Sequence, residues 1–113
     1  MKLDSAVLYS NNIERAVEFY RDLIGLKVDY VEHDSFASFW FDNARLSIKK
    51  KSEARELPGA QTIFIATEKI KKDYGRMKKR NVKFLKELIE RPWGLEFSIA
   101  DPDGNKIEFV QRK

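Results

Sequence analysis

The stretch DPDGNKIEF (residues 101–109) joins a turn to a strand, and it decides the fold because its pattern occurs twice in the chain. Proline fixes φ, and glycine and asparagine accept positive φ, so DPDGN predicts a tight turn. The following residues alternate as in a strand, with Glu108 between Ile107 and Phe109. An earlier stretch, DNARLSI (residues 42–48), aligns with residues 103–109 and makes Ser47 the counterpart of Glu108. The alignment indicates an internal duplication.

The first half of the chain predicts a strand, a helix and three further strands. Residues 2–10 form a short, mostly apolar run, and Asn11 or Asn12 is placed to cap the helix that follows. Asn11 with Glu14 also has the spacing of a capping box, and Gly25 is placed to end the helix. The three strand-like runs are residues 26–34, 35–42 and 44–50.

The second half predicts the same order. A strand at residues 61–67 precedes a helix that Thr67 can cap and Asn81 can end, and three strands follow at 82–90, 95–100 and 106–111. The offset between the halves is 57 residues from Ser5 to Thr62 and 61 residues from Ser47 to Glu108. We therefore expect one α+β domain over 1–113, with a first βαβββ module at about 1–50, a linker at 51–59 and a second module at about 60–113.

Composition excludes several classes of protein. The 113 residues suit one domain, 42% hydrophobic and 12% aromatic residues exclude disorder, and no apolar run is long enough for a membrane span. The absence of cysteine excludes disulfides and thiolate metal sites, and we expect no secretion signal and a cytoplasmic location. The net charge of +4 arises from lysine-rich segments at 49–51 and 69–80. Without a nucleic-acid motif, these segments are better explained as solvated surface.

Two segments together resemble a known family. They are ERAVEFYRDLIGL (residues 14–26) and RPWGLEFSIADPDGNKIEFVQ (residues 91–111). The chain resembles the glyoxalase / bleomycin resistance protein / dioxygenase group, the vicinal oxygen chelate superfamily. The resemblance implies two βαβββ modules whose curled mixed sheets form a cup-shaped cavity, and it implies a homodimer.

The resemblance also implies four metal-ligand positions, a His on the first strand and a Glu on the last strand of each module. In this sequence they are occupied by Ser5, Ser47, Thr62 (or Gln61, if the register shifts by one) and Glu108. Serine and threonine hydroxyls are poor neutral ligands, and Glu108 alone would hold a transition metal weakly. The single histidine, His33, lies on another strand, away from these positions. We therefore expect no metal and no other cofactor.

Strand alternation predicts which side chains line the cavity. The predicted ligand-binding residues are Ser5, Val7, Trp40, Arg45, Ser47, Thr62, Phe64, Trp93 and Glu108. The sequence leaves open whether even- or odd-numbered residues of 35–42 face inward. Each tryptophan suits either a core or dimer interface or a ligand-stacking wall, and the resemblance places Trp93 at the cavity mouth. Glu96 matches an acidic residue that the family often has after WG, although a solvated carboxylate is an equal alternative.

The basic cavity rim constrains the ligand. Arg45, Lys49 and Lys106 favour a neutral or anionic, partly aromatic small molecule over a cationic drug. The sequence thus favours a metal-free small-molecule binding protein that is a homodimer without nucleic-acid or membrane partners, and it leaves catalysis undecided. One alternative is a lyase, isomerase or dioxygenase with an atypical metal site, or with Glu108 in metal-free acid-base chemistry. Another is a structural or protein-binding dimer whose cup is filled by its own side chains.

Overall fold

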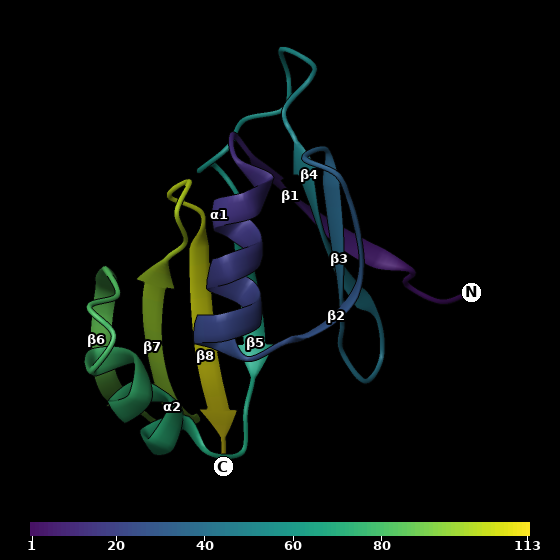
Figure 1. Cartoon of the computed structure of the whole chain (residues 1–113). Coiled ribbons are helices and arrows are strands. Elements are labelled where there is room, and N and C mark those ends of the chain that lie inside the picture. Colours follow the sequence, from purple (N-terminus) through teal and green to yellow (C-terminus); the bar gives the residue numbers. More distant parts are fainter.

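The first half of the protein forms a four-stranded mixed sheet with one helical segment. The structure, a computed structural model, describes residues 1–113 (Figure 1). The first-half elements are β1 (Ser5–Ser10), α1 (Ile13–Glu18), its π-helical continuation η1 (Phe19–Ile24), β2 (Lys27–Glu32), β3 (Phe36–Trp40) and β4 (Arg45–Lys50). The strand order is β1-β4-β3-β2, in which β1 runs parallel to β4 and the other neighbours are antiparallel.

The second half repeats this topology. Its elements are β5 (Thr62–Ala66), α2 (Ile70–Lys78), β6 (Phe84–Arg91), β7 (Gly94–Ala100) and β8 (Lys106–Arg112). The strand order is β5-β8-β7-β6, and again the first strand is parallel to the last. The predicted α+β fold of two βαβββ units is therefore confirmed.

The ends of the elements differ from the sequence prediction in detail. The side chain of Asn12 caps α1 by accepting from Arg15 N at 3.1 Å, whereas the backbone of Asn11 donates to Asp103. Gly25 ends η1 with a φ of 89°, as predicted. Thr67 lies two residues before the N-cap of α2, which is Lys69, and its hydroxyl donates to Asp73 instead. The first strand begins at Ser5, which pairs with Arg45, and not at Lys2 as the apolar run predicts.

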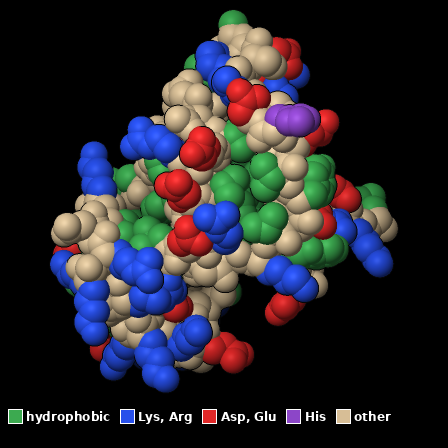
Figure 2. Space-filling model, in the orientation of Figure 1, with side chains coloured by type: hydrophobic (Ala, Val, Ile, Leu, Met, Phe, Trp, Pro, Cys, Tyr) green, Lys and Arg blue, Asp and Glu red, His purple; other side chains and the backbone are tan.

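A single hydrophobic core joins the two halves. Its 17 buried residues include Leu8 and Ile48 from the first sheet and Ile65 and Phe109 from the second. In Figure 1, α1 and η1 lie across the gap between the two sheets, where Tyr20 is fully buried. Burial of this apolar surface from both halves is the main force that holds them together. None of the helices is long and apolar enough to cross a membrane. Lys and Arg side chains gather on the surface in the region of α2 (Figure 2).

The DPDGN turn connects three separate segments through Asn105. The buried Asn105 side chain accepts from Gly59 N at 2.9 Å and Gln61 N at 3.1 Å, and it donates to Tyr9 O at 3.1 Å. It also donates to Asp101 within the turn at 3.0 Å. One side chain thus satisfies backbone groups of the linker and of β1, which fixes both against the second sheet.

The linker has a fixed structure built around a buried carboxylate. Glu56 is only 3% exposed, and it accepts hydrogen bonds from Lys49 Nζ at 2.7 Å and from Ser52 N at 2.8 Å. The hydrogen bonds from Lys49 and Ser52 lower the pKa of Glu56 to about 2. Lys51 Nζ donates in turn to the carbonyl oxygens of Glu53 and Glu56 at 2.7 and 2.6 Å. The segment that the sequence predicts only as a polar linker is therefore an ordered loop.

Candidate functional site

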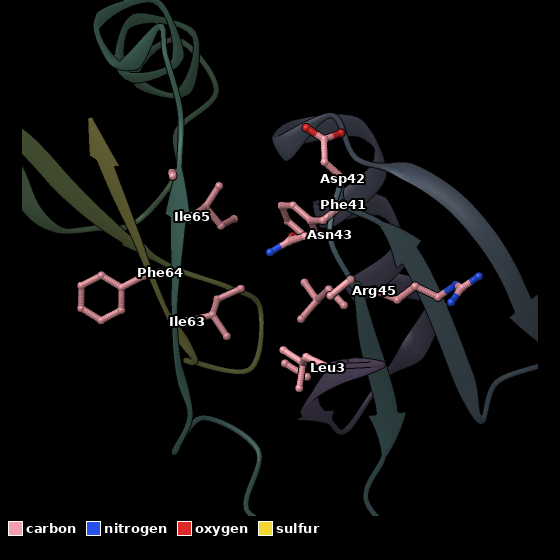
Figure 3. Close-up of a pocket in the computed structure, with 12 residues that line it drawn as sticks. Leu3, Phe41, Asp42, Asn43, Arg45, Ile63, Phe64 and Ile65 are labelled. Atoms are coloured by element: carbon pink, nitrogen blue, oxygen red, sulfur yellow. The ribbon is translucent and has the colours of Figure 1, made fainter. Parts of the chain in front are cut away.

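Each sheet turns one face towards the shared core and the other away from it. Ile63 and Ile65 of β5 point across an apolar cleft of about 470 Å³ towards the side that carries Leu3 and Phe41 (Figure 3). Figure 3 shows Phe64 and Arg45 pointing away from this cleft in opposite directions. The first outer face carries Ser5, Val7, Ser38, Trp40, Arg45 and Ser47, and the second outer face carries Thr62, Phe64, Glu96, Ser98, Lys106 and Glu108.

The strand registers show how the two outer faces correspond. On the first face, one row runs across the sheet through Val7, Ser47, Ser38 and Tyr30. On the second face, the equivalent row runs through Phe64, Glu108, Ser98 and Lys86. Ser47 and Glu108 occupy the same place in the two rows, as the sequence alignment predicts. The two rows lie on faces that point apart, so one chain does not bring all the predicted site residues together.

The structure settles two registers that the sequence left open. Thr62 pairs with Lys106 and lies on the second outer face, whereas the Gln61 side chain accepts from Tyr9 N and donates to Leu57 O. In β3, Ser38 pairs with Ser47 on the first outer face, together with Trp40. Ala37 and Phe39 are fully buried in the core. The even-numbered residues of this strand therefore face outward.

The first outer face holds an arginine stacked on a tryptophan. The Arg45 guanidinium carbon lies 4.0 Å from the centroid of the Trp40 ring, and Arg45 Nε lies 2.9 Å from Asp29 Oδ2. Cation–π attraction and the ion pair together restrict the orientation of the guanidinium. Trp40 remains 41% exposed. This face thus presents an oriented cation beside an exposed aromatic ring.

The second outer face holds two neighbouring carboxyl groups among cations. Glu108 is 2% exposed, and its oxygens lie 3.5 Å from Lys86 Nζ and 3.4 Å from Lys106 Nζ. Glu96 forms ion pairs with Lys86 and, at 3.2 Å, with Arg91 Nε. Burial, followed by the Glu96 carboxylate, raises the pKa of Glu108, and the nearby lysines only partly oppose this shift. A hydrogen bond from Glu108 and the ion pair with Lys86 lower the pKa of Glu96 to about 2. Of the two carboxyl groups, Glu108 therefore has the higher pKa and takes up a proton first as the pH falls.

Neither tryptophan belongs to the core of the chain. Trp93 is 37% exposed in the turn between β6 and β7, and the Arg112 guanidinium carbon lies 5.0 Å from its ring centroid. Trp40 is similarly exposed and stacks on Arg45. Each module thus presents one tryptophan with one arginine, which leaves an interface or a ligand wall as their roles.

The metal-ligand positions of the family do not form an ion site in this chain. No group of three or more His, Cys, Asp or Glu side chains is arranged to hold a metal ion. Ser5 and Ser47 lie on the first outer face, and Thr62 and Glu108 on the second. Lys86 and Lys106 beside Glu108 add positive charge where a divalent cation would have to bind. The residues present therefore do not fit the metal, and no reaction step is assigned to one.

The sequence did not predict some members of these clusters. Asp29 reaches Arg45 at an irregularity of the β2–β3 ladder between Val28 and Tyr30. Lys86 lies between two register shifts in the β6–β7 ladder, so strand alternation does not predict its face. For Glu96 the sequence offers only the family pattern, which leaves a site residue and a solvated carboxylate as alternatives. Its burial and its two ion pairs favour a structured cluster over a solvated carboxylate.

Comparisons with known proteins agree with this architecture. The uncharacterized protein YraH of Bacillus subtilis (strain 168) is 30% identical, with 98% of each chain covered. Among solved structures, TnmS3, an antibiotic binding protein from Streptomyces sp. CB03234, has a TM-score of 0.87 at 20% identity, with 100% of this chain and 97% of that chain covered. Lactoylglutathione lyase from Agrobacterium tumefaciens has a TM-score of 0.84 at 17% identity, with 96% and 92% covered. At these identities, the two structures establish the fold alone.

The family assignment rests on the sequence match as well as the fold. Residues 2–109 match the Glyoxalase/Bleomycin resistance protein/Dioxygenase superfamily. The match spans both βαβββ units and includes ERAVEFYRDLIGL and DPDGNKIEF, which carry the resemblance. The chain therefore belongs to the glyoxalase / bleomycin resistance protein / dioxygenase superfamily.

Proposed function

We propose that this protein binds a small aromatic molecule without a metal, as a homodimer in which an outer face of one chain meets an outer face of its partner. The proposal rests on one observation, that the two outer faces of a single chain point away from each other. Each face holds half of the predicted site and exposes large apolar side chains to solvent. Trp40 is 41% exposed and Phe64 is 66% exposed. A second copy would cover these side chains and complete the cavity.

The charges of the outer faces favour a neutral or anionic ligand. Arg45 is held beside Trp40, and Lys86 and Lys106 lie on either side of Glu108, whose neutral form is favoured by burial. A planar anion could stack on Trp40 while its negative group pairs with the Arg45 guanidinium. The similarity to an antibiotic binding protein supports sequestration of such a molecule.

A ligand screen tests this proposal. The protein is heated with a panel of aromatic carboxylic acids, phenols and antibiotics, because a ligand that binds the native state must raise the melting temperature. Arg45→Met is expected to weaken binding of the acids about tenfold or more. Arg55→Met is the matched control, since Arg55 lies in the linker and its side chain is 84% exposed. Stabilisation by none of these compounds would contradict the binding function.

The dimer and the metal are tested separately. Light scattering after size exclusion is expected to give twice the mass of the chain, and a monomer at micromolar concentration would contradict the shared cavity. Metal analysis of the purified protein is expected to find no stoichiometric transition metal. Stoichiometric nickel, zinc, iron or manganese would favour the enzyme alternative instead.

A further inference from the structure

The second outer face contains two buried polar atoms that make no hydrogen bond within the chain, although Lys86 Nζ lies 3.5 Å from one of them. They are Glu108 Oε2 and Ser98 Oγ, on side chains that are 2% and 1% exposed. Ser98 and Glu108 are direct neighbours in the β7–β8 ladder and lie on the same face. Buried polar groups almost always have a hydrogen-bond partner, because leaving one unpaired is unfavourable. Two such atoms side by side indicate that something outside the chain satisfies them.

The neighbours of these atoms restrict the chemistry of the occupant. Phe64 pairs with Glu108 in the β5–β8 ladder and is 66% exposed, so an aromatic ring is available beside the carboxyl group. Lys86 and Lys106 lie within 3.5 Å of the Glu108 oxygens and disfavour a cationic group. Glu96 is already paired with Lys86 and Arg91. Glu108 and Ser98 are therefore the residues that can still form hydrogen bonds with a ligand. Their surroundings favour a ligand that carries a neutral polar group on an aromatic ring.

A phenol fits both protonation states of Glu108. A phenolic hydroxyl donates to a carboxylate and accepts from a carboxylic acid, and it can exchange a second hydrogen bond with a serine hydroxyl. An ether only accepts, and an ammonium group only donates. Of these groups, the phenol alone complements the pair in either state.

We infer that Glu108 and Ser98 form a subsite for a phenolic hydroxyl whose ring packs against Phe64. The inference rests on the proposed small-molecule binding function and narrows its ligand class to hydroxylated aromatic compounds. Lys86 and Lys106 cover the carboxyl group, and their side chains are 32% and 39% exposed. Because lysine side chains are long and flexible, their movement opens the subsite without a change in the backbone.

Two probes that differ by a hydrogen-bond donor test the subsite. They are 2-naphthol and its methyl ether, 2-methoxynaphthalene, titrated into the full-length protein by calorimetry. The naphthol is expected to bind about tenfold more tightly, as for one hydrogen bond to an ionisable group. Ser98→Ala and Glu108→Met are expected to reduce this preference to nearly one. Glu90→Met is the control, because Glu90 is an exposed carboxylate on β6, and it is expected to keep the preference.

The outcomes separate the subsite from the wider function. Equal affinity for the two probes, or no binding of either, would overturn the subsite even if other aromatic compounds stabilise the protein. A preference that persists in both Ser98→Ala and Glu108→Met would overturn it as well. Should Glu108→Met not fold, as judged by its melting curve, Ser98→Ala decides the result. Failure of the whole ligand panel would instead contradict the proposed function itself.

Discussion

The hydroxyl of Tyr20 donates a 2.6 Å hydrogen bond to Oδ2 of Asp101, and both residues are buried. The bond joins η1 of the first half to the turn before β8 of the second half. Burial, together with the Asp101 charge, raises the pKa of Tyr20 well above its usual value, so this tyrosine stays protonated and remains a donor. The bond is thus one of several polar links between the two halves, together with those that Asn105 and Arg76 make to Tyr9 and Leu23.

Removal of the Tyr20 hydroxyl should destabilise the whole protein. Tyr20→Phe leaves the buried Asp101 carboxylate without one of its donors, which is expected to lower the free energy of unfolding by about 1–3 kcal/mol. Urea denaturation measures this change. Tyr74→Phe is the matched control, because the Tyr74 hydroxyl makes an equally short bond of 2.6 Å to Glu87 at an exposed site. Equal losses in the two variants would show that burial of the Tyr20 bond is unimportant.

The sequence predicted the fold because its signals are local. Turn residues such as Gly25, and a repeat that aligns Ser47 with Glu108, identify the two βαβββ units without tertiary information. The relative orientation of the units depends on long-range contacts such as the bond from Arg76 to the carbonyl of Leu23, which no local pattern encodes. Strand alternation therefore predicted which residues of β1, β4, β5 and β8 share a face. It did not predict the face of β3 or the position of Lys86, and it did not show that the two faces point apart.

The buried carboxylate of the linker should matter for stability. Glu56→Gln removes the charge that Lys49 and the backbone of Ser52 stabilise, so the variant should melt several degrees below the wild type at neutral pH. The folded-state pKa of Glu56, about 2, lies below its unfolded value of about 4.3. Its contribution is therefore present above about pH 4.3 and disappears as the pH falls towards 2. Melting curves across this range should show the two proteins converging.

An exposed glutamate of the same loop is the control for Glu56. Glu53→Gln changes the charge equally, but the Glu53 side chain is 57% exposed. Its melting temperature should stay close to that of the wild type. If Glu53→Gln lowered the melting temperature as much as Glu56→Gln, both effects would be due to the change in net charge.

Glu108 should make the stability of the folded protein depend on pH in the opposite direction to Glu56. Because the folded state raises the pKa of Glu108, its contribution is complete below the unfolded value of about 4.3 and is lost as the pH rises through the folded value. Glu96, Arg91, Lys86 and Lys106 are the charged groups around it. Glu108→Gln, which cannot ionise, should therefore gain stability relative to the wild type between pH 4 and 8 by urea denaturation. A constant difference over this range would contradict a raised pKa of Glu108 in the folded state.

Replacement by alanine should raise the stability of the protein at one glycine and lower it at another. Gly75 lies within α2 with open space around it, so Gly75→Ala should stabilise the protein by about 0.4–1 kcal/mol. Gly94 has a φ of 149°, and an added β-carbon would collide with the backbone oxygen of Gln111. Gly94→Ala should therefore destabilise the protein by about 1–3 kcal/mol or more. Thermal unfolding of both variants checks the signs, and a stable Gly94→Ala protein would mean that β7 and β8 separate readily at this point.

The side chain of Asn105 has a consequence for attempts to divide the molecule. It accepts from the backbone of Gly59 and Gln61, at the end of the linker and just after it, and it donates to the carbonyl of Tyr9 in the first half. A cut within the linker would place Tyr9 on a different fragment from its donor and would expose the apolar core of each fragment to water. Although the two halves repeat one unit, we therefore expect that neither folds alone and that fragments produced separately recover structure only when mixed.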